Sequence, residues 1–368
     1  MKVAIVNCFD TFMDRQQALI DFFQARGDGV TAFLSDFRHR DKVTWTTAPN
    51  GYTMIPGLPY HKNLSIKRMY SHSKFAKAAK DVLAKEKWDL IWVLVPPNSL
   101  VKQCAQYKRT HPDTKLVFDV NDLWPESFPL GGLKSLPPFQ MWRSLRDQHL
   151  MAADYVVTEC DLFRKRLNLE QNGNASTIYF CKPEEKLALD RTAVLPEDYF
   201  SVCYLGSINH IIDIDAIVAI LSSLKTVRPV KLHIIGDGEN KLHLINQVQG
   251  VGVEVTDHGA VYDAAKKQAV FNRCHFGLNV MKPTVCVGLT MKSIDYFAGA
   301  LPVINSIPGD TWELIDRNKF GFNWDGSQEL DWLSLDQTKA RQAARKFFEE
   351  ELSYRSFSHR LESVLAKI

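Results

Sequence analysis

The sequence predicts an α/β protein with two domains, each built on a parallel β-sheet. Short, continuously apolar runs such as Lys2–Cys8 and Asp89–Val95 alternate along the chain with segments of helical periodicity. Strands that are apolar at every position are typical of parallel sheets, because helices cover both faces of such sheets. The chain has 368 residues, which is more than one hydrophobic core usually supports, so two domains are expected.

Composition narrows the class of protein. With 45% hydrophobic and 24% charged residues, the chain resembles an ordinary globular protein. No apolar run approaches the roughly 20 residues of a membrane span, and the opening strand is too short for a signal peptide. The seven cysteines form no C-x-x-C pair, which favours buried thiols in a reducing cytoplasm over disulfides or a zinc site. A cytoplasmic protein is therefore expected.

The first domain is expected to open with a strand–helix–strand unit. Lys2–Cys8 is the first strand, Arg15–Ala25 carries apolar residues at helical spacing, and Val30–Leu34 is the second strand. Ligands of parallel sheets bind beyond the carboxyl ends of the strands. The loop with Asp10 is therefore expected to face a ligand. The alternative is that Asp10 is an ordinary turn residue.

Ser65–Lys87 is expected to form a long helix with one buried and one basic side. The predicted buried side consists of Ile66, Met69, Tyr70, Ala76, Ala79, Val82 and Leu83. The rest of its surface is basic, through Lys62, Lys67, Arg68, Lys74, Lys77 and Lys80. These cations either form a solvated helix face or meet an anionic lipid or lipid-phosphate acceptor. The basic balance of residues 1–120 favours an anionic partner without indicating nucleic acid.

A polar corner follows the predicted strand Lys115–Val120. The segment 121–127 reads N-D-L-W-P-E-S and places Asp122 and Glu126 beside a rigid proline and Trp124. Because it lies at the carboxyl end of a strand, it is a candidate corner for stacking a sugar and for acid–base chemistry. The alternative is a loop fixed in place by a buried tryptophan.

The second domain repeats the strand–turn–helix pattern. Phe200–Leu205 runs into Gly206, and Lys231–Ile235 runs into Gly236-Asp237-Gly238. A G-x-G turn alone does not specify a dinucleotide site, because the complete G-x-G-x-x-G pattern and an acidic residue about 20 positions later are both missing.

The stretch from Val285 to Ile315 carries the chemistry of this domain. Gly288 allows backbone N–H groups to approach a ligand, and Thr290 can cap the helix that follows. A helix N-terminus of this kind favours an anion, Lys292 adds a cation, and Asp295 lies on the same side of the helix. Phosphates and ribose hydroxyls of a nucleotide suit this set. The alternative is a surface helix with one ion pair.

The run G-L-T-M-K-S-I-D-Y-F-A-G-A-L-P-V-I at 288–304, followed by a G-x-x-x-E-L-I segment, resembles the donor-binding segment of retaining glycosyltransferases of family 4. The segment D-L-W-P-E-S resembles the acceptor side of the same family. The resemblance implies a GT-B fold, two Rossmann-like domains with a cleft between them. The expected limits are 1–183 for the acceptor-side domain and 199–349 for the donor domain, with a last helix at about 350–368 packing back on the first.

The resemblance also implies roles for individual residues. Asp295, in place of the usual glutamate, would hold the ribose, while Val287 stands where the family often has a second glutamate. The family's diphosphate-binding Arg and Lys after Gly206 are replaced by Ser207, Asn209 and His210. The expected donor-binding residues are Gly206, Ser207, Asn209, His210, Gly236, Asp237, Gly238, Val261, Gly288, Leu289, Thr290, Lys292 and Asp295. The expected catalytic residues are Lys292, Asp122 and Glu126, with Asp10 and Trp124 on the acceptor side.

The sequence therefore predicts a glycosyltransferase that moves a sugar from a nucleoside-diphosphate sugar, expected to be a UDP-hexose. The family resemblance implies that the anomeric configuration is retained. The expected acceptor is a glycan, a polyprenol-linked sugar or another glycoconjugate, as in surface polysaccharide synthesis. No metal or other cofactor is expected, because no convincing D-x-D pair is present and Lys292 can stabilise the departing diphosphate. Peripheral contact with the inner face of the membrane is a further expectation. The alternatives are a non-catalytic partner subunit and a sugar-nucleotide epimerase.

Overall fold

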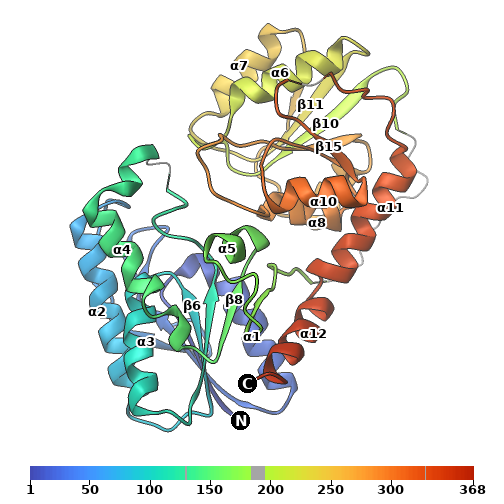
Figure 1. Cartoon of the computed structure of the whole chain (residues 1–368). Helices are drawn as coiled ribbons and strands as arrows, with labels where there is room; N and C mark the ends of the chain where they lie inside the picture. The colour runs from blue at the N-terminus through green and yellow to red at the C-terminus, as the bar shows by residue number, and fades with distance from the viewer. Residues whose placement is uncertain (129–130, 184–194, 328) are drawn as a thin grey trace. The chain divides into compact units, whose positions relative to one another are not determined.

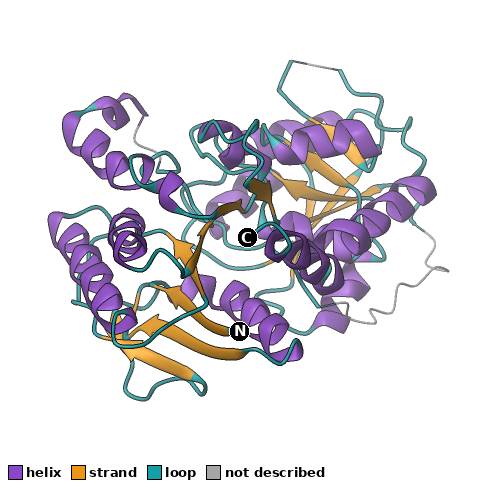
Figure 2. Ribbon diagram, turned by 60° about the horizontal axis from the view of Figure 1, so that its bottom comes forward, coloured by secondary structure: helices purple, strands orange, loops and turns teal. Residues whose placement is uncertain are grey.

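The computed structural model describes residues 1–128, 131–183, 195–327 and 329–368. These residues form two compact units, the first made of 1–181 and 357–368 and the second of 182–356. The stretch between the two expected domains, residues 184–198, lies largely in 184–194, outside the described residues. In each unit the strands lie between helices (Figure 2), as expected for sheets covered on both faces.

The first unit contains a seven-stranded parallel sheet in the order β5-β2-β1-β6-β7-β8-β9. Its strands are β1 (Lys2–Asn7), β2 (Gly29–Ser35), β5 (Tyr52–Ile55), β6 (Leu90–Val95), β7 (Lys115–Val120), β8 (Tyr155–Thr158) and β9 (Ala175–Thr177). A small antiparallel pair, β3 (Phe37–Arg38) and β4 (Val43–Thr44), follows β2. Every residue of β6 is buried, so the strand at the middle of the sheet is covered on both faces.

The helices of this unit are α1 (Met13–Ala25), α2 (Ile66–Leu83), α3 (Asn98–Thr110), α4 (Pro137–Asp147) and α5 (Asp161–Arg166), with single turns η1 (Asp10–Phe12), η2 (Gly131–Ser135) and η3 (Leu150–Ala152). The last helix, α12 (Tyr354–Leu365), enters this unit at Phe357. It lies beside α1 (Figure 1), where Arg26 Nη1 is 2.5 Å from Glu362 Oε2.

The second unit contains a six-stranded parallel sheet in the order β12-β11-β10-β13-β14-β15. Its strands are β10 (Phe200–Leu205), β11 (Val230–Ile235), β12 (Glu254–Asp257), β13 (Phe276–Asn279), β14 (Val303–Asn305) and β15 (Gly321–Asn323). Its helices are α6 (Ile214–Lys225), α7 (Lys241–Gly250), α8 (Ala264–Phe271), α9 (Met291–Ala298), α10 (Asp310–Asn318) and α11 (Gln337–Phe347), followed by the turn η4 (Phe348–Leu352). The prediction of an α/β protein with two parallel-sheet halves is confirmed.

The buried face predicted for α2 is wrong in its first two turns. Ile66 and Tyr70 are 88% and 54% exposed, whereas Arg68, placed on the basic surface by the sequence, is 2% exposed. The buried residues are Arg68, Ser71, His72, Phe75, Ala76, Ala79 and Leu83. They follow helical spacing from Arg68 onward, because the Arg68 guanidinium lies over the Trp124 ring at 4.2 Å from its centroid. Arg68 is therefore buried in the first turns of α2, where the apolar pattern predicted that Ile66 and Tyr70 would be buried.

Candidate sugar-nucleotide site

The turns after β10 and β11 are packed backbone against backbone. The Gly206 N–H donates to the Ile235 carbonyl at 2.9 Å, and the Ile208 N–H donates to the Asp237 carbonyl at 2.9 Å. A Cβ atom on Gly236 would lie 2.0 Å from the Gly206 oxygen, and Gly236 has φ +154°. Only glycine tolerates that approach and that backbone conformation. The G-x-G turn therefore shapes the backbone at the carboxyl edge of the sheet, where ligands of such sheets bind.

The N-terminus of α9 is fixed at the same edge. Thr290 is its N-cap, with Oγ1 accepting from the Ser293 N–H at 3.1 Å, as the sequence predicts. The loop before it is held by Thr311, whose N–H and Oγ1 donate to the Gly288 carbonyl at 3.0 and 2.8 Å. Leu289 is 8% exposed and anchors this loop. The first N–H groups of α9 are thus held rigidly, as an anion site requires.

A ladder of asparagine side chains connects α9 to the sheet. Asn279, Asn305 and Asn323 are the last residues of β13, β14 and β15 and lie in register. Asn279 Nδ2 donates to Asn305 Oδ1 at 2.8 Å, and Asn305 Nδ2 donates to Asn323 Oδ1 at 3.0 Å. Thr290 Oγ1 donates to Asn279 Oδ1 at 2.7 Å. This ladder is not among the features predicted from the sequence, although the strand ends F-G-L-N, V-I-N and G-F-N all finish in asparagine.

Lys292 is a buried cation without a carboxylate partner among the described residues. Lys292 is 9% exposed, and its Nζ atom donates to Tyr204 Oη at 3.3 Å. Nζ also lies 4.5 Å from the centroid of the Tyr204 ring. A Cβ atom built on Gly206 would lie 4.0 Å from Lys292 Cε, so the side chain reaches the turn after β10. Burial lowers the pKa of the Lys292 ammonium to about 7.

Asp295 lies one turn further along α9 and is already engaged. Its Oδ1 atom is 2.6 Å from Lys182 Nζ and 2.6 Å from Lys267 Nζ, and its side chain is 16% exposed. Lys182 is itself anchored, because its N–H donates to the Leu352 carbonyl and its carbonyl accepts from the Tyr354 N–H. Lys182 and Lys267 were not predicted as neighbours of Asp295, because both are remote from it along the chain.

The other predicted donor-binding residues are spread over the same loops. Ser207 and Asp237 are exposed, and Asn209 Oδ1 accepts from the Ile211 N–H at 3.1 Å. His210 Nδ1 lies 3.6 Å from Glu239 Oε1, with both side chains well exposed. Gly238 follows Asp237, and Val261 is half-buried beyond β12. Residues 207–209 contain no Lys or Arg, whereas the Lys292 side chain of α9 reaches the Gly206 turn.

The predicted acceptor-side residues belong to the first unit. Asp122 Oδ1 accepts from the Leu123 N–H at 2.7 Å and Oδ2 accepts from Trp124 Nε1 at 2.5 Å. Burial raises the pKa of the Asp122 carboxyl, against the opposing effect of hydrogen bonds from Ser127 and Trp124. Glu126 Oε1 lies 2.9 Å from Arg143 Nε and 2.8 Å from Arg146 Nη2. Both carboxylates are therefore held by groups of their own loop and of α4.

Trp124 and Asp10 also have local partners. Trp124 is 6% exposed and stacks on His72, with ring centroids 5.8 Å apart and planes 21° apart. Asp10 Oδ1 accepts from the His39 and Arg40 N–H groups at 2.7 and 3.3 Å, the arrangement expected of a turn residue. Tyr60 and His72 add to the aromatic packing in this part of the unit, with ring centroids 5.9 Å apart.

No group of three or more His, Cys, Asp or Glu side chains in the described residues has the geometry to hold a metal ion. Among the same residues, no helix has the length and apolar character needed to cross a bilayer.

Comparisons with known proteins place the fold. No family model matches the sequence, and no curated protein matches it in sequence either. Solved structures match over the whole length. Sucrose-phosphate synthase from Thermosynechococcus elongatus has a TM-score of 0.68 at 14% identity and covers 100% of this chain and 98% of its own. Anabaena HepE (Alr3699) in complex with UDP has a TM-score of 0.68 at 12% identity, with 100% of both chains covered.

The lipopolysaccharide outer core galactosyltransferase WaaB, in its apo form, has a TM-score of 0.69 at 13% identity, again with 100% of both chains covered. These neighbours are GT-B glycosyltransferases, and the two Rossmann-like halves of this chain have the same fold. At 12–14% identity the likeness defines the fold, and function has to be argued from the site.

Proposed function

We propose that this chain is a glycosyltransferase that moves a hexose from a UDP-sugar to a glycan or glycolipid acceptor, with retention of anomeric configuration. The resemblance to family 4 at 288–304 supports retention, and the UDP held by HepE supports the uridine nucleotide. The proposed setting is the synthesis of a surface polysaccharide or other glycoconjugate by a cytoplasmic enzyme lying peripherally on the inner face of the membrane.

The observation that carries the proposal is the buried Lys292 ammonium. A buried cation without a carboxylate partner is costly unless a ligand supplies the anion. Lys292 reaches the Gly206 turn, and Thr290 fixes the α9 N-terminus beside it. A diphosphate bound there would accept hydrogen bonds from Lys292 Nζ and from the backbone amides of the Gly288–Lys292 loop.

The chemistry follows from that placement. The bond between the sugar's anomeric carbon and the diphosphate oxygen breaks, and its electron pair stays on the diphosphate. The acceptor hydroxyl forms the new bond to the anomeric carbon and gives its proton to the departing diphosphate. Lys292 and the α9 amides stabilise the charge that develops on the leaving group. We propose that Asp122 and Glu126 contribute through the shape of the 121–127 loop, because their own hydrogen bonds and ion pairs engage both carboxylates.

Turnover of a panel of UDP-sugars, measured as release of free UDP, tests the proposal. We expect Lys292→Ala to lower turnover about a hundredfold or more, the effect of losing one preorganised charge stabiliser. Lys339→Ala is the matched control, because its ammonium belongs to an 84% exposed side chain in the same unit. EDTA should leave the rate unchanged. Activity silenced by EDTA and restored by manganese, or normal turnover in Lys292→Ala, would contradict the proposal.

A second candidate, a non-catalytic subunit that binds a sugar nucleotide, is favoured by Asp295. Its carboxylate is held by Lys182 and Lys267, and Val287 stands where a second acid is usual. Such a subunit would bind UDP by calorimetry and release none from any UDP-sugar, whereas an epimerase would keep the nucleotide on its product. In either binding case Asp295→Ala should weaken UDP binding by about 1.5–3 kcal/mol if this carboxylate holds the ribose.

A further inference from the structure

A pocket of about 960 Å³ lies at the amino-terminal edge of the second sheet, and we call it the amino-edge pocket. Among its lining residues, Phe200 opens β10, His275 immediately precedes β13, and Arg228 lies two residues before β11. The Gly206 and Gly236 turns lie at the opposite, carboxyl edge. Because β10 has six residues, the two edges are roughly 20 Å apart. A ligand in the amino-edge pocket would therefore not touch the proposed sugar-nucleotide site.

The lining of the amino-edge pocket carries more positive than negative charge. Four cationic side chains and two carboxylates line it: Arg228, Arg341, Arg345, Lys346, Glu197 and Glu349. Arg345 Nε lies 2.7 Å from Glu349 Oε1, and Glu197 is exposed. Burial and, to a smaller extent, the charge of Arg341 lower the pKa of His275 to about 4, so His275 is neutral at pH 7. The lining therefore has a net charge of +2, from four cations and two carboxylates.

Arg341 is held by backbone carbonyls rather than by an acid. Its Nη1 donates to the Ala300 carbonyl at 3.2 Å, and its Nη2 donates to the Phe271 carbonyl at 3.2 Å and to the Cys274 carbonyl. These bonds engage three of the five N–H groups of a guanidinium. Burial lowers the pKa of Arg341, as expected for a cation that no carboxylate among the described residues neutralises. A bound anion would supply the missing negative charge.

Arg228 and Lys346 have weaker partners. The Arg228 guanidinium lies over the Phe200 ring, 5.6 Å from its centroid, and the described structure gives it no ion pair. Lys346 Nζ lies 3.8 Å from Glu350 Oε1, with both side chains well exposed, and such surface pairs contribute little. Guanidinium groups bind phosphate through two parallel hydrogen bonds, and lysines bind it as point charges. The cations of the amino-edge pocket therefore suit a phosphate group.

Apolar side chains form the other part of the same lining: Leu195, Pro196, Phe200, Trp332, Leu333 and Leu335. Leu333 is 54% exposed, whereas Trp332 is 3% exposed and its Nε1 donates to Ser223 Oγ at 3.0 Å. Pockets for small molecules have volumes of about 300–1,000 Å³ and combine apolar walls with a few polar groups. The amino-edge pocket therefore has room for a phosphate group together with an apolar or ring-shaped part.

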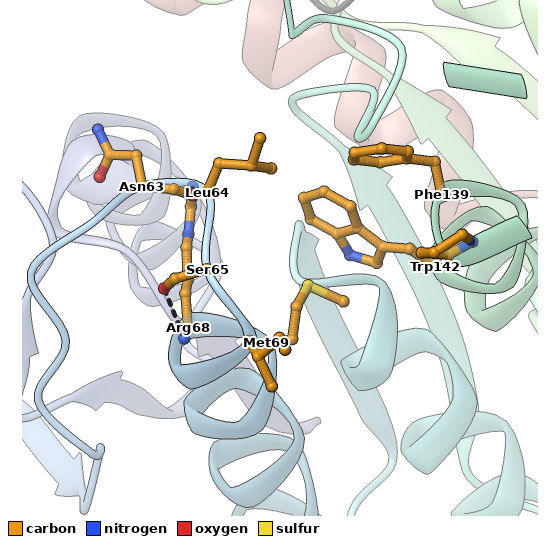
Figure 3. A pocket seen from close by; sticks show the side chains of 9 residues that line it. Asn63, Leu64, Ser65, Arg68, Met69, Phe139 and Trp142 are labelled. Atoms are coloured by element: carbon orange, nitrogen blue, oxygen red, sulfur yellow. Dashed lines mark hydrogen bonds between the residues drawn. The ribbon is translucent and has the colours of Figure 1, made fainter. Parts of the chain in front are cut away.

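A smaller pocket in the first unit provides a contrast (Figure 3). Its volume is about 220 Å³, and Leu64 and Met69 face Trp142 across it. Arg68 is the charged residue of its lining among the described residues, and its guanidinium already lies over the Trp124 ring. That pocket is apolar with one engaged cation, whereas the amino-edge pocket brings together several cations that lack a carboxylate.

We propose that the amino-edge pocket is a binding site for a small phosphate ester. The phosphate accepts hydrogen bonds from Arg228, Arg341 and Lys346, and the organic part lies against Leu333 and Leu335. This site is separate from the proposed sugar-nucleotide site and does not depend on it. A plain phosphate ion fills only the charged part, so the apolar wall should favour an ester over inorganic phosphate.

Calorimetry with phenyl phosphate and with inorganic phosphate tests the proposal. Both titrations use Lys292→Ala as well as the parent, because a phosphate could also bind beside Lys292. We expect Lys292→Ala to bind phenyl phosphate. The affinity for phenyl phosphate should be about tenfold or more above that for inorganic phosphate, because the phenyl ring buries apolar area.

Variants of the cations locate the bound ester. In the Lys292→Ala background, Arg228→Gln should weaken phenyl phosphate binding about tenfold or more, the effect of losing a charge-assisted hydrogen bond. Lys346→Gln should weaken it up to about fivefold, because its ammonium is exposed. Arg317→Gln is the matched control, since Arg317 is exposed in the same unit and does not line the pocket. Arg341 stays unchanged, because its carbonyl contacts also support the fold.

The opposite results would overturn the proposal. If Lys292→Ala does not bind phenyl phosphate, the amino-edge pocket is not a phosphate site. Binding by Arg228→Gln equal to that of its background would place the ester elsewhere, and equal affinity for phenyl phosphate and phenol would show that the phosphate is not recognised. Chemical denaturation checks that each variant is folded. UDP binding by Arg228→Gln in the parent background should be unchanged, which separates failure at this pocket from failure at the sugar-nucleotide site.

Discussion

The two units differ in the partner that each gives to a buried cation near the carboxyl end of its sheet. In the first unit, Arg15 and Asp119 are buried as a bidentate pair, with Nε–Oδ2 and Nη2–Oδ1 distances of 2.8 and 2.9 Å. Trp92 Nε1 and Asn121 Nδ2 add hydrogen bonds to the same carboxylate. In the second unit, Lys292 is buried with a phenol as its partner. The first charge is neutralised by a carboxylate within the fold, while the described residues bring no carboxylate to the second.

Arg68 shows that an ion pair is not the only way to satisfy a buried cation. Its guanidinium lies over the Trp124 ring and within 6.0 Å of the centroids of Phe9, Tyr60 and Phe128. Its Nη1 donates to the Asn63 carbonyl. Several rings and a carbonyl surround this cation, whereas among the described residues the Lys292 ammonium contacts the ring and the hydroxyl of Tyr204. We expect the number of partners to distinguish a cation that supports the fold from one that a bound anion can pair.

The largest effect on stability is expected at the completed pair. Arg15→Met leaves the Asp119 carboxylate buried without its cation, so the free energy of unfolding should fall by about 3–5 kcal/mol. Chemical denaturation monitored by tryptophan fluorescence measures this change. The double variant Arg15→Met with Asp119→Leu should recover much of the loss, and no recovery would show that the cost has another origin.

Replacing Lys292 by methionine should change the free energy of unfolding in the opposite direction to Arg15→Met. At pH 6, where the Lys292 amine is still mostly protonated, Lys292→Met removes a buried charge that has no carboxylate partner among the described residues, so the free energy of unfolding without ligand should rise by about 1–4 kcal/mol. UDP binding should weaken in the same variant, because the leaving-group contact is lost. A loss of stability in Lys292→Met would mean that its ammonium supports the fold, as Arg15 does.

The pH dependence of UDP binding tests whether the Lys292 amine takes up a proton when UDP binds. Burial lowers the pKa of Lys292 to about 7, so at pH 8 the amine is mostly neutral in the free protein and a bound diphosphate would protonate it. Calorimetry in buffers of different ionisation enthalpy should show uptake of close to one proton at pH 8 and little uptake at pH 6. UDP itself is fully ionised at pH 8, since phosphate monoesters have a second pKa near 6. Lys292→Met should show no uptake.

The stability of the protein without UDP should also depend on pH through Lys292. The unfolded chain holds the Lys292 proton up to about pH 10.4, whereas the folded chain releases it near pH 7. The unfolded state thus binds more protons between these values, and stability should rise with pH across this window. The Lys292→Met variant should lack this rise, as measured by denaturation between pH 7 and 10.

The smallest effect is expected at Ala300, which has φ +54°. Left-handed backbone is costly for residues with a Cβ atom, while glycine adopts it freely at some cost in unfolded-state entropy. Ala300→Gly should raise the free energy of unfolding by up to about 1 kcal/mol. Denaturation measures this, and Ala298→Gly in α9 is the control, which should be destabilising because it places glycine in a helix.

The sequence alone determined the elements that depend on neighbouring residues. Continuous apolar runs predicted the parallel strands, the G-x-G segment predicted the tight turn after β11, and Thr290 predicted the start of α9. These features follow from steric limits and hydrogen bonds within a few residues. For this reason the α/β class and the two halves were predictable without a structure.

Only the tertiary structure decided which charges are engaged. The sequence placed Asp295 at a ribose, and folding brings Lys182 and Lys267 to its carboxylate. The sequence placed Arg68 on a basic face, and folding buries it over Trp124. The asparagine ladder forms only when three strands align in register. Burial and partner choice depend on residues far apart in the chain, and the free energy of a charge depends on both.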